Sequence, residues 1–252
     1  MPDFKQIISP VLGVPGQNTP ITEAQAHPPI IAYSTTGATA AVHGVSQAEG
    51  HAVLGVSAKG DGVHGQAAIA TMSGVAGTNT AGGNGVYGAS SGNAGCFDGN
   101  VQVNGNITIT GDLFLPGADC AEHFDVAANQ TLTAGMLVAI DESGALRQSD
   151  RPYDRAVAGV IAGAGRYRPG IILDQQRSEA PRAALSLIGK TYCYADATAA
   201  PIAVGDLLTS SSTPGHVMKA EDRSRAFGSV VGKALQPLSS GTGLIPILIA
   251  LQ

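Results

Sequence analysis

The sequence predicts an all-β protein: a trimeric β-helical or intertwined β shaft, followed by a globular, β-barrel-like head with an internal duplication. Three observations predict this class. Val-x-Gly triplets recur every 10–12 residues in the first half, and three consecutive six-residue repeats follow them. The last half holds short apolar runs bounded by Gly, Pro and Asp, without a helical period. Four regions are therefore expected: an extended anchoring arm (1–36), a repeat shaft (37–100), a β stem (101–117) and a duplicated head (118–252).

Charge separates the two halves of the chain. Residues 1–117 carry two basic and six acidic side chains, whereas residues 118–252 carry twelve and thirteen. The charged fraction of 13% and the net charge of −5 argue against a coiled coil, a highly charged disordered chain and a polybasic nucleic-acid binder. No apolar run is as long as a membrane-spanning helix requires, so no membrane insertion is expected. The beginning of the chain lacks the features of a secretory signal, which predicts synthesis in the bacterial cytoplasm.

Proline dominates the beginning of the chain. Six of the fourteen prolines lie between Pro2 and Pro29, which excludes a long helix or a central strand there. Apolar residues persist between them, including Ile7, Ile8 and Val11. We therefore expect residues 1–36 to form an arm that docks on a neighbouring protein. A disordered tail is the alternative.

The Val-x-Gly triplets provide too small a core for one chain. Each repeat offers one inward valine, which contributes ~1.5–3 kcal/mol when buried. Ordering the backbone costs roughly 1–2 kcal/mol per residue. Three chains around a shared axis would pool these side chains and remove exposed strand edges. The expected core positions in the shaft are Val42, Val53, Val63, Val75 and Val86.

The stem consists of three six-residue repeats of the form apolar-x-apolar-x-Gly-x. The two apolar residues of each repeat alternate as in a strand, and the glycine permits a turn with positive φ. One short strand per chain in each turn fits an intertwined trimeric stem. Its expected core residues are Val101, Val103, Ile107, Ile109, Leu113 and Leu115.

With these repeats and its β-rich C-terminal half, the sequence resembles trimeric fibres and spikes of tailed phages and phage-like particles. The resemblance covers residues 37–252 in pattern. It implies a homotrimer on the surface of a virion or phage-like particle, a head or tail protein of that particle as partner of residues 1–36, and attachment to host-surface polysaccharide. Five triplets make a short shaft, which suggests a spike or a small fibre.

The middle position of the triplet is a candidate glycan-binding site. If valine points inward, strand alternation turns this position outward. His43, His64 and Tyr87 would then be available to stack on sugar rings and bond to them. An ordinary solvent-exposed surface is one alternative. The other is a reversed register, in which three symmetry-related histidines surround the axis and bind an ion.

The head is expected to be a barrel made from two similar units. Shifting residues 118–252 by 70 positions aligns Leu137 with Leu207 and Val160 with Val230, with a one-residue slip that matches Gly144 to Gly215. Two such units favour a compact barrel that closes its own edges. The strands are expected at these runs: Met136–Ile140, Val157–Ile161, Ile171–Leu173, Ala184–Ile188, Leu207–Leu208, Val230–Val231 and Leu244–Leu251.

The sequence contains no recognised catalytic or nucleotide-binding motif, so we expect neither enzymatic activity nor a cofactor. Asp119, Glu122 and His123 suggest a metal or acid–base site; alternatively, Asp119 and Glu122 cap a short turn or pair with Arg155. The three cysteines are expected to be small buried apolar residues.

Two enzymatic alternatives remain open. The stretch 205–216 resembles C-terminal head domains found behind phage-type repeat shafts, some of which are self-cleaving intramolecular folding chaperones. A glycan depolymerase would instead need paired carboxylates, and the shaft and stem offer Glu49, Asp61, Asp98 and Asp112.

Overall fold

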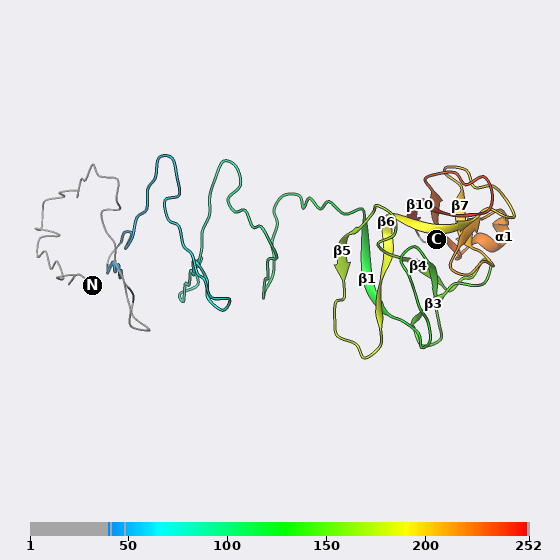
Figure 1. The fold of residues 1–252 in the computed structure, drawn as a ribbon, viewed down its shortest axis with the longest axis horizontal. Coiled ribbons are helices and arrows are strands. Elements are labelled where there is room, and N and C mark those ends of the chain that lie inside the picture. The colour runs from blue at the N-terminus through cyan, green and yellow to red at the C-terminus, as the bar shows by residue number, and fades with distance from the viewer. Residues whose placement is uncertain (1–39, 41, 48, 251–252) are drawn as a thin grey trace, which may run out of the picture. The chain divides into compact units, whose positions relative to one another are not determined.

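The computed structural model describes residues 40, 42–47 and 49–250, so the predicted arm (1–36) lies outside the described residues. The chain divides into two units, Met1–Val101 and Gln102–Gln252, which are considered separately. The protein is nearly all β, and every strand among the described residues lies in the second unit (Figure 1).

The described residues of the first unit form no helix or strand, and all of them are exposed. Successive repeats nevertheless approach each other closely at the triplet glycines. A Cβ atom added to Gly55 would lie 2.6 Å from Cγ2 of Val63, the valine of the next triplet. The same contact, at 2.6–2.8 Å, recurs at Gly44, Gly65 and Gly77. Any side chain at the third triplet position would therefore displace the following repeat.

The stem also lacks strands in the single chain, and residues 102–116 are exposed. Neither Gly105 nor Gly111 has a positive φ, so neither adopts the turn conformation that glycine permits. Both glycines have open space where a side chain would be.

The head contains ten strands and one short helix. Each of the seven predicted runs overlaps a strand, while β1, β3 and β8 were not anticipated; Leu251 of the last run lies outside the described residues. The elements are β1 (Asp119–Asp125), β2 (Leu137–Ile140), β3 (Leu146–Gln148), β4 (Val157–Ile161), β5 (Pro169–Leu173), β6 (Arg182–Asp196), β7 (Leu207–Ser210), β8 (Val217–Lys219), α1 (Arg223–Ala226), β9 (Val230–Ala234) and β10 (Thr242–Ala250).

The long strand β6 joins two groups of strands. Its second half closes a five-stranded barrel, in which neighbouring strands follow the order β6, β10, β9, β7, β8 and back to β6. Its first half pairs with β1 and β4, and β4 continues through β2 to β3. A single bridge from Val126 to Leu146 connects β3 back toward the end of β1. In Figure 1, β6 runs from beside β1 toward β7 and β10.

The two groups repeat one strand arrangement, as a duplication would produce. In the first group Val138 pairs with Gly159, and the ladder is irregular directly after Val138. In the second group Leu208 pairs with Gly232, and the ladder is irregular directly after Leu208. Each pair therefore joins an apolar residue of one strand to a glycine of the next strand, at the same place in the ladder.

The predicted shift of 70 positions correctly aligns β2 with β7. It is wrong for β4 and β9. Val157 pairs with Ala139 in one group and Val230 pairs with Thr209 in the other, so Val230 corresponds to Val157 and not to Val160. The second group is thus slightly longer between these strands. Part of the added length lies between β8 and β9, where the second group contains α1.

Each group has its own apolar cluster, and β2 and β4 lie between the two clusters. Val138 and Ile161 belong to the cluster of the first group. Their neighbours Leu137 and Val160 belong to the larger cluster of the second group. Strand alternation therefore joins the two halves into one head with two adjacent cores.

Candidate functional site

The predicted trimer-core residues are exposed along the whole shaft and stem. Their exposed fractions range from 43% at Leu115 to 75% at Val86. The described part of the single chain thus leaves a long series of apolar side chains uncovered: Val42, Val53, Val63, Val75, Val86, Val101, Val103, Ile107, Ile109, Leu113 and Leu115. Exposed apolar side chains in such number are typical of an association surface.

The three candidate glycan-binding residues are exposed and lie in different repeats. Tyr87 is 78% exposed, and His43 and His64 are also exposed. The Nδ1 atom of His64 lies 3.4 Å from a carboxylate oxygen of Asp61 in the preceding loop.

The segment that holds Asp119, Glu122 and His123 is strand β1, so the expected turn is wrong. Asp119 is buried and accepts a hydrogen bond from the hydroxyl of Ser186 on β6. Glu122 and His123 instead line a cavity that does not include Asp119. Among the described residues, no group of three or more His, Cys, Asp or Glu side chains is suited to a metal ion.

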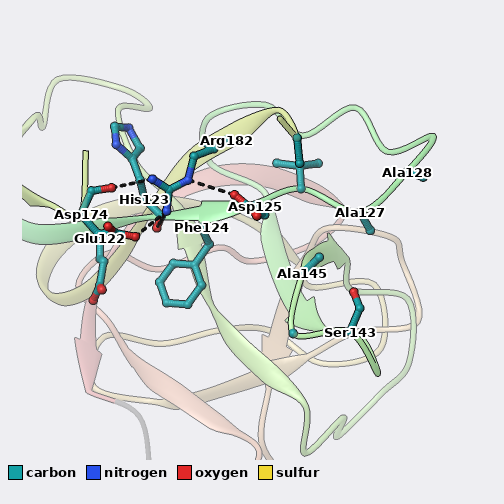
Figure 2. Close-up of a pocket in the computed structure, with 13 residues that line it drawn as sticks. Glu122, His123, Phe124, Asp125, Ala127, Ala128, Ser143, Ala145, Asp174 and Arg182 are labelled. Atoms are coloured by element: carbon teal, nitrogen blue, oxygen red, sulfur yellow. Dashed lines mark hydrogen bonds and ion pairs between the residues drawn. The ribbon is translucent and has the colours of Figure 1, made fainter. Parts of the chain in front are cut away.

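Arg182 is the central residue of that cavity, which has a volume of about 440 Å³. Its guanidinium donates to the carbonyl oxygens of Asp174 and Gln176 at 2.7 and 2.9 Å, and to that of His123 at 2.7 Å. It also pairs with the carboxylates of Asp174 and Asp125 at 2.5 and 3.0 Å (Figure 2). Arg182, and not Arg155, is thus the cation beside β1.

These contacts assign Arg182 a structural role. Four hydrogen bonds occupy its two terminal nitrogens, and Nε lies 3.0 Å from the carboxylate of Asp125; together these contacts join β1, the end of β5 and the start of β6. A guanidinium used in this way has little capacity left for a substrate. The cavity is best explained as part of the scaffold.

Strand β5 provides a second uncovered apolar surface that the sequence did not reveal. It pairs in parallel with β1 and with no other strand of the head. Ile171, Ile172 and Leu173 are exposed on it. A cavity of about 280 Å³ beside them is lined by Ile188 and by Leu115 of the last stem repeat. An open apolar edge of this kind normally requires a cover.

The cysteines differ in their surroundings. Cys193 is buried in the core, as expected, and burial raises the pKa of its thiol. Cys120 is half-buried. Cys96 is exposed, so the expectation of a buried apolar residue is wrong there. In the part of the chain that the structure describes, no helix is long and apolar enough to cross a membrane.

No known family model matches the sequence, and no curated protein matches it. Three solved structures show a distant similarity in fold. The pre-mature gene product 12 of bacteriophage phi29 has a TM-score of 0.43 and 14% identity; the match covers 59% of this chain and 24% of that chain. The C-terminal fragment of the same protein gives 0.35 and 15%, covering 52% and 100%. The N base of the phi29 head fiber gp8.5 gives 0.28 and 19%, covering 51% and 92%.

Proposed function

We propose that this protein is a homotrimeric fibre or spike of a phage or phage-like particle, with a structural role and a role in attachment to host-surface polysaccharide. Residues 1–36 anchor it to a head or tail protein of the particle. The shaft and stem hold the head away from that anchor, and the exposed surfaces of shaft and head meet the host.

The observation that carries this proposal is the uncovered apolar series from Val42 to Leu115. These side chains repeat at regular spacing, and the described chain buries none of them. Folding of this region as a monomer would order many residues without the burial that offsets the entropy loss. Association of three copies supplies that burial, and the close glycine contacts allow successive repeats to stack regularly along the axis.

The exposed strand β5 supports association in the head as well. Its apolar side chains lie next to Leu115, the last core residue predicted for the stem. An interface that begins in the stem would continue onto this edge and cover it.

Electron microscopy of purified particles tests the attachment to a particle. An antibody against residues 118–252 should label a projecting appendage at its distal end. A variant lacking residues 1–30 should still form the trimer and should be absent from the particles. Normal incorporation of the shortened variant would contradict the anchoring role of the arm.

A further inference from the structure

The outer face of β6 has an unusual series of side chains. Lys190, Tyr192 and Tyr194 point to one side of the strand, while the alternating residues Thr191 and Cys193 are buried on the other. The neighbouring strand β10 places leucine and proline side chains beside them, because Leu248, Pro246 and Leu244 pair with the three residues in that order. We call Lys190, Tyr192 and Tyr194, together with Tyr167 and His216, the tyrosine stripe.

One end of the stripe is cationic. The ring of Tyr167 lies 5.1 Å from that of Tyr192 at an interplanar angle of 42°. Arg166 and Lys190 lie 5.5 and 5.4 Å from the centre of the Tyr167 ring. Arg168 fixes this loop, since its guanidinium donates to three backbone carbonyl oxygens of the loop. Two positive charges are thus held against an aromatic surface.

The other end of the stripe borders a pocket of about 440 Å³ whose surface is mostly apolar. Its wall includes the Tyr194 and His216 rings, whose centres are 5.5 Å apart. The Nδ1 atom of His216 lies 2.8 Å from the carbonyl oxygen of Pro214, a pure acceptor. Nδ1 therefore donates, which leaves Nε2 of the neutral ring as an acceptor. Gln148 and Thr242 add amide and hydroxyl groups to the same wall.

The positive charges near the stripe are not neutralised by ion pairs within the described chain. None of the ion pairs between described residues involves Arg166 or Lys190. Lys233 on β9 is a third cation that takes part in none of these ion pairs. In the sheet, Leu248 of β10 lies between Lys233 and Lys190, because it is the strand-pairing partner of both. An acidic ligand would supply the missing negative charge.

We propose that the tyrosine stripe binds an acidic polysaccharide, a proposal that rests on the attachment function proposed above. A sugar ring presents C–H groups that pack on aromatic faces and hydroxyls that bond to Gln148, Thr242 and Nε2 of His216. A carboxylate on a neighbouring sugar then meets Arg166 or Lys190. From Lys190 to Tyr194 the strand rises roughly 14 Å, longer than a single pyranose ring.

The same chemistry could serve a single-stranded nucleic acid, but charge favours the polysaccharide. The chain carries a net charge of −5, which opposes a polyphosphate backbone over any longer distance. An acidic polysaccharide with one carboxylate per repeat requires only the few cations present here.

The test measures retention of the full-length protein on immobilised polygalacturonate, alginate, hyaluronate and polysialate, with dextran as the neutral polymer and oligo-dT as the nucleic acid. We expect retention on at least one acidic polymer, weakened by salt, and none on dextran. The exposed pair Arg166→Gln/Lys190→Gln should weaken this binding at least tenfold without affecting the fold, and Tyr194→Ala should weaken it as strongly. Arg223→Gln removes one charge from the exposed helix α1 and should change binding less than twofold.

Other results would overturn the assignment in distinguishable ways. Retention on no acidic polymer contradicts the stripe assignment, whereas retention on dextran alone would move attachment to a neutral polysaccharide. Retention that survives these changes but is lost in Tyr87→Ala places binding on the shaft and leaves the attachment function intact. Binding to oligo-dT alone would assign the stripe to nucleic acid. A changed oligomeric mass of the Arg166→Gln/Lys190→Gln variant would show that the stripe is an interface between copies of the chain.

Discussion

Asp119 is a buried carboxyl group whose surroundings favour its protonated form. Burial raises its pKa above the usual aspartate value, and the hydrogen bond from Ser186 offsets only part of that effect. The unfolded chain therefore releases this proton at lower pH than the native protein does. It follows that stability falls as the pH rises from the ordinary aspartate range, about 4, through the raised native pKa of Asp119.

Replacement of this carboxyl should consequently stabilise the head. We expect Asp119→Asn to melt a few degrees above the wild type at pH 7.5. The amide does not ionise, so no buried charge is formed, and its oxygen still accepts the hydrogen bond from Ser186. The advantage should disappear toward pH 4. Thermal unfolding followed by circular dichroism at both pH values measures this; a variant that melts lower at neutral pH would show that Asp119 is bound as a carboxylate.

Asp196 is the matched control, because its pKa is shifted in the opposite direction. Burial alone would raise its pKa, but hydrogen bonds from Thr198, Thr213 and Ser211 outweigh burial and lower the pKa. Its stabilising contribution is present above the ordinary aspartate range and is lost as the pH falls through its lowered native pKa. Asp196→Asn should therefore destabilise the head at neutral pH by about 1–3 kcal/mol, and by less in acid.

At the scale of elements, the sequence predicted the strands with continuous apolar runs and missed those without them. β1 reads Asp-Cys-Ala-Glu-His-Phe-Asp, and β3 and β8 have three residues each, so neither hydrophobicity nor length distinguishes them from loops. The predicted run in β6 ended at Ile188, before Gly189 and Lys190. The structure continues through Gly189 with a φ of +111°, where an added Cβ would lie 2.6 Å from the carbonyl oxygen of Ala118.

Two equivalent glycines test the duplicated architecture. A Cβ at Gly159 would lie 2.6 Å from the carbonyl oxygen of Ser186, and one at Gly232 would lie 2.0 Å from that of Leu248. Because backbone cannot withdraw without breaking the ladder, Gly159→Ala and Gly232→Ala should each destabilise the head by roughly 3 kcal/mol or more. Urea unfolding provides the measurement.

Gly205→Ala is the control for these two substitutions. Gly205 has a φ of +89° with open space around it, so alanine there adds only backbone strain of about 1 kcal/mol. If all three substitutions lowered the free energy of unfolding equally, positive φ, and not contact with the neighbouring strand, would determine the requirement for glycine.

The register of the shaft is tested by two neighbouring residues. Val63→Asp would place three carboxylates in one dry layer of the proposed trimer and should abolish assembly. His64→Asp lies beside it on the proposed outer side and should leave assembly and melting nearly unchanged. Chemical cross-linking followed by gel electrophoresis distinguishes the two. If His64→Asp prevents assembly and Val63→Asp does not, the register is reversed and the axial ion-binding interpretation gains support.

Candidate binding residues were harder to predict than strands. The alternation Lys190-Thr-Tyr192-Cys-Tyr194 was present in the sequence as a strand signal, but its connection to Tyr167 and His216 depends on the pairing of distant segments. By contrast, His43, His64 and Tyr87 were selected from the repeat alone, and they remain a prediction.

At the scale of the whole molecule, the head and the shaft meet their packing requirements differently. The head buries two apolar clusters and closes a barrel within one chain. The described shaft and stem bury none of their apolar side chains, and in the shaft successive repeats approach each other closely at the triplet glycines. The sequence predicted this contrast from charge and repeat spacing, and it accounts for the dependence on partner copies that we propose.

The mass of the purified protein in solution tests the central claim most directly. Size-exclusion chromatography with multi-angle light scattering at micromolar concentration should give three times the 25.2 kDa of the chain. The mass should stay constant on dilution until the shaft unfolds. A folded protein with the mass of a single chain, and with a shaft that resists proteolysis, would contradict the trimeric account.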